Sequence, residues 1–263
     1  MSEVLAVSPH LDDAVLSAGG RIAELTGAGH RVTVFTVFAG LAAGPYSPVA
    51  RRFHEEWGFA GDPVPHRRAE DLRALSWLGA DPVHGAFLDA IYRTDPFGHW
   101  IVSGVPTEHV TRDEKELTSR ISETVRALIE SLRPGLLLTC ASVGDHVDHI
   151  HTCEAVQTAA ATTGVRLQLW TDLPYAKLPS RSLPDGLAAR IGAHSPQPYL
   201  LSEHAWRAKL RAVGEYASQH AMFWPGVADI DHVMHQQAAG LGSVFGYVGP
   251  CEVLWEPAAG RCD

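Results

Sequence analysis

Two short clusters of histidine and aspartate contain the residues of this chain that are best suited to hold a metal ion. The first is Ser8-Pro9-His10-Leu11-Asp12-Asp13-Ala14, and the second is His146-Val147-Asp148-His149. Imidazole nitrogens and carboxylate oxygens are the usual protein ligands of catalytic zinc, which takes three of them and leaves a fourth position open. Together the clusters predict a divalent-metal site that has acid and base groups to spare.

The spacing within the clusters suggests which residues bind the metal. His10 and Asp13 are three positions apart at the start of a predicted helix, so they face the same side and can share an ion. His149, from the start of a different helix, can supply the third ligand. Asp12 is adjacent to Asp13 but points elsewhere, so it can act as a general base that takes a proton from the attacking water.

His146 and Asp148 are predicted to assist. His146 lies three residues before His149 and would lean over the same cavity, where a charged imidazole could stabilise an oxyanion or protonate a leaving group. Asp148 is placed to orient an imidazole and raise its pKa. A plainer alternative stays open, because Asp12, Asp13 or Asp148 could simply cap the helix that it begins.

The elements predicted around the clusters alternate between strand and helix. Apolar, β-branched runs predict strands at Val4–Val7, Arg31–Phe38, Leu136–Cys140 and Val165–Trp170, with a weaker strand at Val83–Leu88 and a last one at Cys251–Trp255. Helical spacing of apolar residues predicts helices at Asp12–Ala28, Arg67–Leu78, Asp148–Thr163 and Ser202–His220. A capping box, Thr111-x-x-Glu114, opens a further helix that ends before Pro134.

This alternation predicts an α/β fold with a doubly wound, mostly parallel sheet flanked by helices, in a single Rossmann-like domain over residues 1–263. Each cluster then lies at the carboxyl edge of the sheet, where ligands bind in this class of fold. Two irregular segments, around 89–112 and 174–201, are predicted to shape a substrate pocket. Trp206, Phe223 and Trp224 are candidates to line it, because aromatic rings pack well on sugar faces.

Composition narrows the functional class. The 263-residue chain is 46% hydrophobic and 19% charged, which is typical of a globular protein with a full core. Its formal net charge of −9 argues against binding to nucleic acid or anionic lipid. No apolar run approaches the ~20 residues that span a bilayer. The four scattered cysteines suggest reduced thiols, so we expect a cytoplasmic protein whose oligomeric state stays open, a homo-oligomer included.

At both clusters the sequence resembles the LmbE-like, or PIG-L, superfamily of zinc-dependent N-deacetylases. The family's A-H-P-D-D-E motif corresponds to the first cluster and its H-P-D-H motif to the second. Two weaker motifs keep the family's order, R-x-x-E at Arg67–Glu70 and Y-x-S-Q at Tyr216–Gln219. Leu11 and Val147 replace the family's prolines, and Ala14 replaces a glutamate, but no proposed ligand or base is lost.

The resemblance implies roles for the matching residues. His10, Asp13 and His149 would bind Zn²⁺, although Fe²⁺ or another divalent metal would also suit them. Asp12 would be the general base and His146 the electrostatic or acid partner. Arg67 and Asp89 would bind substrate, although Arg67 could equally form a salt bridge on the surface of its helix.

The sequence thus predicts a metal-dependent hydrolase that removes an acyl group, above all acetyl, from a small polar amine such as an amino sugar or glycoside. Two alternatives stay open. Two histidines and a carboxylate also form the facial triad of non-haem Fe(II) oxygenases, although those enzymes favour all-β barrels. A non-catalytic metal-binding protein on the same scaffold is the other alternative, although it would need neither Asp12 nor His146.

Overall fold

The computed structural model describes residues 2–102, 114–175, 191–192 and 194–257, and strands from these ranges form one sheet. The strands are β1 (Glu3–Ser8), β2 (Arg31–Thr36), β3 (Asp81–His84), β4 (Leu136–Cys140), β5 (Arg166–Trp170), β6 (His194–Leu200) and β7 (Cys251–Pro257). Their order is β3-β2-β1-β4-β5-β7-β6, and β1 to β5 are parallel whereas β7 runs antiparallel to both of its neighbours. The predicted fold class is confirmed.

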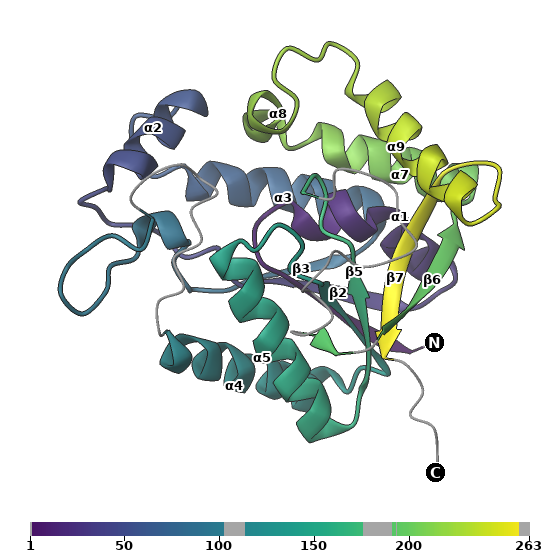
Figure 1. The fold of residues 1–263 in the computed structure, drawn as a ribbon, viewed down its shortest axis with the longest axis horizontal. Helices are drawn as coiled ribbons and strands as arrows, with labels where there is room; N and C mark the ends of the chain where they lie inside the picture. The colour runs from purple at the N-terminus through teal and green to yellow at the C-terminus, as the bar shows by residue number, and fades with distance from the viewer. Residues whose placement is uncertain (1, 103–113, 176–190, 193, 258–263) are drawn as a thin grey trace.

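Helices cover both faces of this sheet (Figure 1). On one face α4 (Lys115–Leu132) packs against α5 (Val147–Thr163), and on the other lie α1 (Asp13–Gly27), α3 (Val64–Leu78) and α7 (Glu203–Gly214). The remaining elements are α2 (Pro48–Glu56), the 3-10 turn η1 (Ala90–Tyr92), α8 (Ala217–Phe223) and α9 (Ile230–Val244). The central strands are therefore buried on both sides, which explains their continuous apolar runs.

The chain reverses its course across the sheet between β1 and β4. It runs outward from β1 through β2 to β3, crosses back to the other side of β1, and continues outward through β4 to β5. Val7 of β1 lies beside Thr139 of β4 in parallel register, so the loops that follow these strands leave the same edge. Such a switch point leaves a crevice between the two loops. Both histidine and aspartate clusters lie there, as the sequence predicts.

Two predicted elements differ from the structure. The weak strand predicted at Val83–Leu88 is wrong in position, because β3 ends at His84 and the next residue, Gly85, donates its N–H to the Thr36 carbonyl as the chain leaves the sheet. The helix predicted at Ser202–His220 is two helices, α7 and α8. Tyr216 lies between them with non-helical angles, and its hydroxyl donates to Asp71 of α3 at 2.7 Å.

The predicted capping box is also wrong at Glu114, the one of its two residues that the structure describes. Thr111 lies outside the described residues, as do the parts of the two predicted pocket segments at 103–112, 176–190 and 193. α4 begins at Lys115 without a side-chain cap, and Glu114 instead binds Arg93. α2, α9 and β6 were not predicted.

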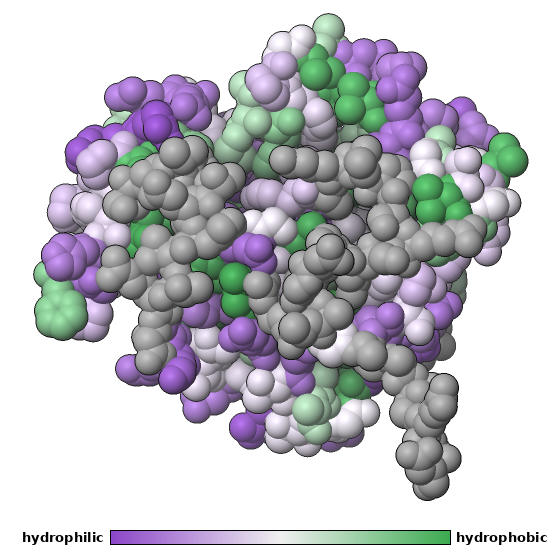
Figure 2. Space-filling model, in the orientation of Figure 1, coloured by the Kyte–Doolittle hydropathy of each residue, from purple (hydrophilic) through white to green (hydrophobic). Residues whose placement is uncertain are grey.

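Among the described residues, Cys140, Cys153 and Cys251 are buried and form no disulfide, whereas Cys262 lies outside the described residues. Within the ranges described above, every helix is too short or too polar to cross a bilayer. On the face shown in Figure 2, apolar side chains gather over α8 and the segment that leads to α9.

Candidate active site

The loop between β1 and α1 is held in one conformation by local contacts. Ser8, the last residue of β1, accepts a hydrogen bond from the Ala14 N–H at 3.1 Å and donates one to the His10 carbonyl at 2.8 Å. Leu11 is buried in a small apolar cluster that anchors the middle of the loop. Leu11 occupies the position of the proline in the A-H-P-D-D-E motif. With Leu11 buried, the residues on either side of it, His10 and Asp12, face the crevice.

None of the three aspartates caps the helix that it begins, so the plainer alternative is wrong. α1 has no side-chain cap, and Asp13 accepts the N–H of His10 at 2.9 Å instead. The N-terminus of α5 is capped by His146, whose Nδ1 accepts the Asp148 N–H at 3.2 Å. The carboxylates of Asp12, Asp13 and Asp148 are directed to the crevice residues.

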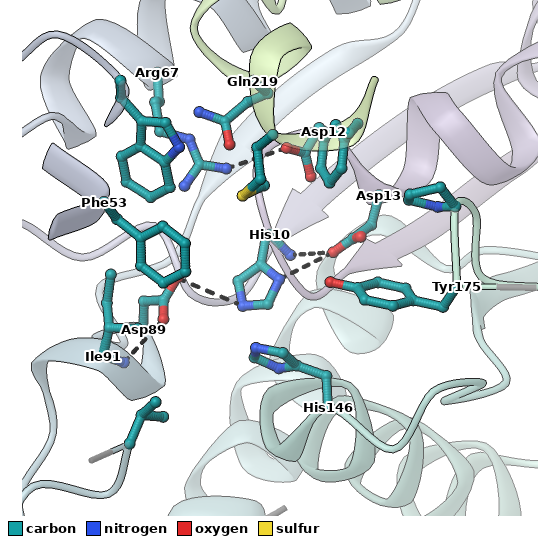
Figure 3. Close-up of a pocket in the computed structure, with 15 residues that line it drawn as sticks. His10, Asp12, Asp13, Phe53, Arg67, Asp89, Ile91, His146, Tyr175 and Gln219 are labelled. Carbon is teal, nitrogen blue, oxygen red and sulfur yellow. Dashed lines mark hydrogen bonds and ion pairs between the residues drawn. The ribbon is translucent and has the colours of Figure 1, made fainter. Parts of the chain in front are cut away.

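The three predicted metal ligands lie together (Figure 3 shows two of them, His10 and Asp13). Oδ2 of Asp13 is 3.2 Å from Nδ1 of His10 and 3.2 Å from Nε2 of His149. Ligand atoms that all lie about 2.0–2.2 Å from a tetrahedral metal are about 3.4 Å apart. His149 Nε2 is also buried without a hydrogen-bond partner among the described residues. Both distances to Asp13 fit a bound divalent ion, and nitrogen atoms of His10, His146 and His149 also lie within 4.8 Å of one another.

A second carboxylate fixes each imidazole from behind. Nδ1 of His149 lies 2.6 Å from Oδ1 of Asp172, and Nε2 of His10 lies 3.0 Å from Oδ2 of Asp148. If these two nitrogens carry the ring protons, the opposite nitrogens keep lone pairs directed at Asp13. Such carboxylate–imidazole pairs orient metal-binding histidines and raise their basicity.

The crevice favours positive charge. Burial lowers the pKa of His10, but the surrounding carboxylates, with Asp89 the strongest, raise it overall to well above 6.5. Burial also opposes charge on His149, yet Asp13 and Asp172 raise its pKa to about 9. A field that favours protonated imidazoles equally favours a divalent cation, which would displace those protons.

Asp12 is buried and has a cationic partner. Nη2 of Arg67 donates to Oδ2 of Asp12 at 3.1 Å, and its guanidinium lies 4.9 Å over the ring of Trp57. Burial raises the pKa of Asp12 to about 7, although Arg67 opposes the rise. A carboxylate of that pKa can accept a proton near neutral pH. Because Arg67 is only 7% exposed, the alternative of a helix-surface salt bridge is wrong.

His146 faces His10 across the crevice, with ring centroids 4.9 Å apart in an edge-on arrangement. Burial, together with the nearby His10, lowers the pKa of His146 to about 3. The ring is therefore neutral near pH 7, and because Nδ1 accepts the Asp148 N–H, its proton lies on Nε2. The sequence suggested a charged His146, whereas its burial and its contact with the Asp148 N–H favour a neutral imidazole with an N–H to donate.

Asp148 orients His10 rather than His146. Besides its contact with His10, its Oδ2 accepts the Ala90 N–H at 2.9 Å, and its Oδ1 accepts from Nη1 of Arg93 at 2.6 Å. Asp148 is fully buried, and Arg93 is the principal group that keeps its pKa far below the usual range despite that burial. It is a positioning residue for a predicted metal ligand.

Arg93 extends this contact to the neighbouring helix. Its guanidinium donates two hydrogen bonds of 2.9 Å to the carboxylate of Glu114, which in turn lies 3.2 Å from Nε2 of His151 on α5. The sequence marked the segment around Arg93 as a pocket wall. The structure instead shows a guanidinium occupied by Asp148 and Glu114, behind the crevice.

A pocket of about 280 Å³ opens over these groups. Asp89 lines it, with Oδ2 3.7 Å from Nε2 of His10 and Oδ1 accepting the Ile91 N–H at 3.1 Å. Tyr175 closes one side, its ring 5.4 Å from that of His149. Of the three predicted aromatic lining residues, Phe223 lines the pocket, whereas Trp206 and Trp224 pack against the main core.

The two weaker motifs meet beside the pocket. Glu70 of α3 accepts hydrogen bonds from the N–H and the hydroxyl of Ser218, at 2.9 and 2.6 Å. This contact joins α8 to α3 and brings Gln219, which is fully buried, to the pocket wall. Oε1 of Gln219 has no hydrogen-bond partner among the described residues, so it can accept one from a bound molecule.

Sequence reasoning missed Asp172, and it included Tyr175 only as part of the predicted pocket segment 174–201. Both follow β5 by a few residues, so they reach the carboxyl edge of the sheet as the two clusters do. That position was a usable signal for Asp172, because strand β5 was predicted correctly. Nothing in the local sequence marks Tyr175 as a neighbour of His149.

Comparison with known proteins connects this site to amide hydrolysis. Residues 5–160 match the PIG-L family, described as GlcNAc-PI de-N-acetylase. Over 260 residues the chain is 27% identical to the 1D-myo-inositol 2-acetamido-2-deoxy-alpha-D-glucopyranoside deacetylase of Corynebacterium diphtheriae. That alignment covers 91% of this chain and 83% of its relative.

Two solved structures are similar over nearly the whole chain. A teicoplanin deacetylase in its zinc-inhibited form is 34% identical, with a TM-score of 0.85 and complete coverage of both chains. The pseudoaglycone deacetylase of an antimicrobial reagent is 38% identical, with a TM-score of 0.80 and coverage of 98% and 99%. The similarity therefore includes both clusters and the pocket helices.

Proposed function

Since the chain belongs to the PIG-L family of de-N-acetylases, we propose that it is a metal-dependent hydrolase of N-acetylated amino sugars or their glycosides. The observation that carries this proposal is the arrangement of Asp13 between two imidazoles, with a separate buried carboxylate, Asp12, in the same pocket. The named relatives are deacetylases of such molecules. The mostly parallel α/β sheet argues against a non-haem Fe(II) oxygenase, because those enzymes favour all-β barrels.

His10, Asp13 and His149 would hold the metal, which we propose to be zinc. A divalent metal at this position polarises an amide carbonyl and makes a nearby water more acidic. Asp148 and Asp172 would keep the two imidazoles in the orientation that such binding requires.

Asp12 would move the proton. It accepts a proton from the water as the water oxygen attacks the carbonyl carbon, and it then gives that proton to the nitrogen as the C–N bond breaks. The products are a primary amine and acetic acid, which loses its proton to solvent to become acetate. Arg67 holds Oδ2 of Asp12, which leaves Oδ1 to face the water.

His146 would stabilise the negative charge that develops on the carbonyl oxygen, by donating its Nε2–H. A donor of this kind typically contributes a factor of about 10²–10³ to the rate. Arg67, Asp89 and the unsatisfied Oε1 of Gln219 would bind sugar hydroxyls.

The test is Asp12→Asn, which keeps the shape of the side chain but removes the base. After zinc reconstitution, we expect turnover of N-acetylglucosaminides to fall about 10²–10⁴-fold while one equivalent of metal is retained. Primary-amine release and metal analysis measure the two effects. Asp231→Asn, at an exposed position on α9, is the matched control.

Undiminished hydrolysis by Asp12→Asn would reject the assignment of the base. If metal-bound wild-type protein released no amine from a broad panel of N-acetylated sugars, the non-catalytic alternative would replace this proposal. Activity after reconstitution with Zn²⁺ or Fe²⁺ separates the two metals.

A further inference from the structure

The pocket has a polar part at the metal-binding residues and an apolar part beside it. The apolar part is formed by six side chains: Phe53 of α2, Trp57, Ile91 of η1, Val102, and Met222 and Phe223 of α8. α2 and α8 are far apart in sequence (Figure 1), but both contribute side chains to this pocket, of which Phe53 of α2 is labelled in Figure 3. We call these six residues the apolar wall.

Most of the apolar wall is separate from the main core, against which only Phe223 of the six residues packs. Phe53, Ile91 and Val102 belong to a separate small cluster, and Phe53 stacks on Trp57 with ring centroids 5.4 Å apart. Met222 keeps 36% of its surface exposed. Apolar surface that lines a pocket in this way is suited to an apolar part of a ligand.

The acetyl group is too small to be that part. Its single methyl cannot cover side chains contributed by two helices and a 3-10 turn. The apolar wall must therefore contact the other end of the substrate, provided that the proposed deacetylation is correct.

Two charged residues lie at the boundary between the two parts of the pocket. Arg67 pairs with Asp12 and stacks on Trp57, 4.9 Å from its ring. Asp89 is 3.7 Å from Nε2 of His10 and accepts the N–H of Ile91. A sugar bound between Arg67 and Asp89, with its acetamido group at the metal-binding residues, would bring its aglycone within reach of the apolar wall.

We propose that the apolar wall is an aglycone subsite, and that the substrate is an N-acetylhexosaminide with an aryl or alkyl aglycone rather than a polyol aglycone. This inference rests on the proposed function. The inference goes beyond the proposed function because it selects one class of glycoside among those that the same reaction could cleave at the amide.

The experiment compares glycosides that differ only in the aglycone. For zinc-reconstituted enzyme, we expect kcat/KM for phenyl and hexyl N-acetylglucosaminides to exceed that for the methyl glycoside at least about tenfold. A second arm keeps the methyl aglycone and compares N-acetyl with N-octanoyl, for which we expect no preference for the longer acyl group.

Variants of the apolar wall test where the preference arises. Met222→Gln and Ile91→Thr should each lower the phenyl-to-methyl ratio of kcat/KM about threefold or more. Leu72→Gln, at a half-exposed position of α3, should leave the ratio unchanged.

Each outcome decides the proposal. Equal kcat/KM for methyl, phenyl and hexyl glycosides would overturn it, and so would a preference for the octanoyl amide, because the wall would then bind the acyl chain. If no glycoside released amine, the proposed function would fail separately. Quenching of tryptophan fluorescence by phenyl and methyl β-D-glucosides would then decide whether the subsite exists, and equal affinities would reject it.

Discussion

At the scale of single residues, proton transfer and hydrogen-bond donation fall to different side chains. Asp12 has a pKa raised to about 7, which suits a base, whereas His146 has a pKa lowered to about 3, which leaves it neutral. Burial is the largest cause in both cases, because it disfavours the charged form of either group. Burial therefore suits Asp12 to accept a proton and His146 to donate a hydrogen bond as a neutral ring.

This division predicts how His146 responds to substitution. His146→Ala should lower kcat about 10²–10³-fold, because the developing oxyanion loses a donor. His146→Gln should lose less, since an amide N–H can replace the imidazole N–H. Both variants should keep their zinc, which metal analysis checks alongside initial rates.

His204→Gln, at an exposed position of α7, is the matched control and should behave as wild type. If the alanine and glutamine variants were equally impaired, His146 would not act as a neutral donor. If either variant lost its metal, His146 would be a ligand instead.

The residues that sequence reasoning found are those whose neighbours in sequence are also neighbours in space. His10 and Asp13 belong to one turn, and His146 and His149 to another, so type and spacing were enough. Asp172 is 2.6 Å from His149 but distant from it in sequence, and its role follows only from the packing of β5 against β4. The charge state of His146 likewise depends on burial, which no local pattern reveals.

At the scale of elements, Arg93 joins three segments of the chain. It follows η1, binds Glu114 at the start of α4, and binds Asp148 of α5, which in turn holds His10. An arginine suits this place because its planar guanidinium can donate to two carboxylates at once. The orientation of a metal ligand therefore depends on contacts behind the pocket.

Arg93→Met should weaken both the fold and the metal site. Asp148 would stay buried, and Glu114 half-buried, without their cation, which costs about 3–5 kcal/mol in free energy of unfolding. Zinc affinity should fall about 10–100-fold, because His10 loses a fixed partner. Urea unfolding of the metal-free protein and competition with a chromophoric chelator measure the two quantities.

Arg126→Met, on the exposed side of α4, controls for the loss of a positive charge. If Arg93→Met bound zinc as tightly as the wild type, Asp148 would hold His10 without help from Arg93. The positioning role proposed for Arg93 would then be wrong.

A second buried ion pair joins α1, α7 and β7. Glu252 of β7 lies 2.6 Å from Nζ of Lys209 and also accepts the N–H groups of Gly20 and Arg21, next to the kink at Ala18. Lys209→Met should destabilise the protein by about 3 kcal/mol or more in urea unfolding, because the Glu252 carboxyl group stays buried but loses its cation.

Arg207→Met, at an exposed position of α7 where only a surface pair with Glu203 is lost, should have little effect on stability. Adding Glu252→Gln to Lys209→Met should recover part of the loss, since the buried charge is then removed. A double variant as unstable as the single one would mean that lost packing, rather than an unpaired charge, is responsible.

Strands and helices with strong periodicity could be predicted because their burial is regular. Leu136–Cys140 is a strand within the stated bounds, and the alternation around it gives the parallel sheet. The helix predicted at Ser202–His220 failed because tertiary hydrogen bonds from Tyr216 and Ser218 to α3 outweigh local helical preference. β6 contains Pro196 and Pro198. Because proline is rare in strands other than edge strands, strand propensity did not predict this element.

At the scale of the whole molecule, the metal site lies where the two halves of the sheet meet. His10 and Asp13 follow β1, His149 follows β4, and Asp172, which holds His149, follows β5, so one ion would strengthen the connection between segments that leave three different strands. A ligand that binds only the folded state stabilises it in proportion to the logarithm of its concentration over Kd. Zinc binding should therefore appear in the unfolding of the entire chain.

At zinc concentrations of about 100–1,000 times Kd, this linkage adds about 2.7–4.1 kcal/mol. For a domain of this size, each kcal/mol raises Tm by about 2–4 °C, so chelation should lower Tm by roughly 5–15 °C. Asp172→Asn should shrink that shift, because it weakens binding without removing a ligand, and His149→Ala should abolish it. If the wild-type protein is first shown to carry zinc and its Tm is then unchanged by chelator, the ion does not bind in this crevice.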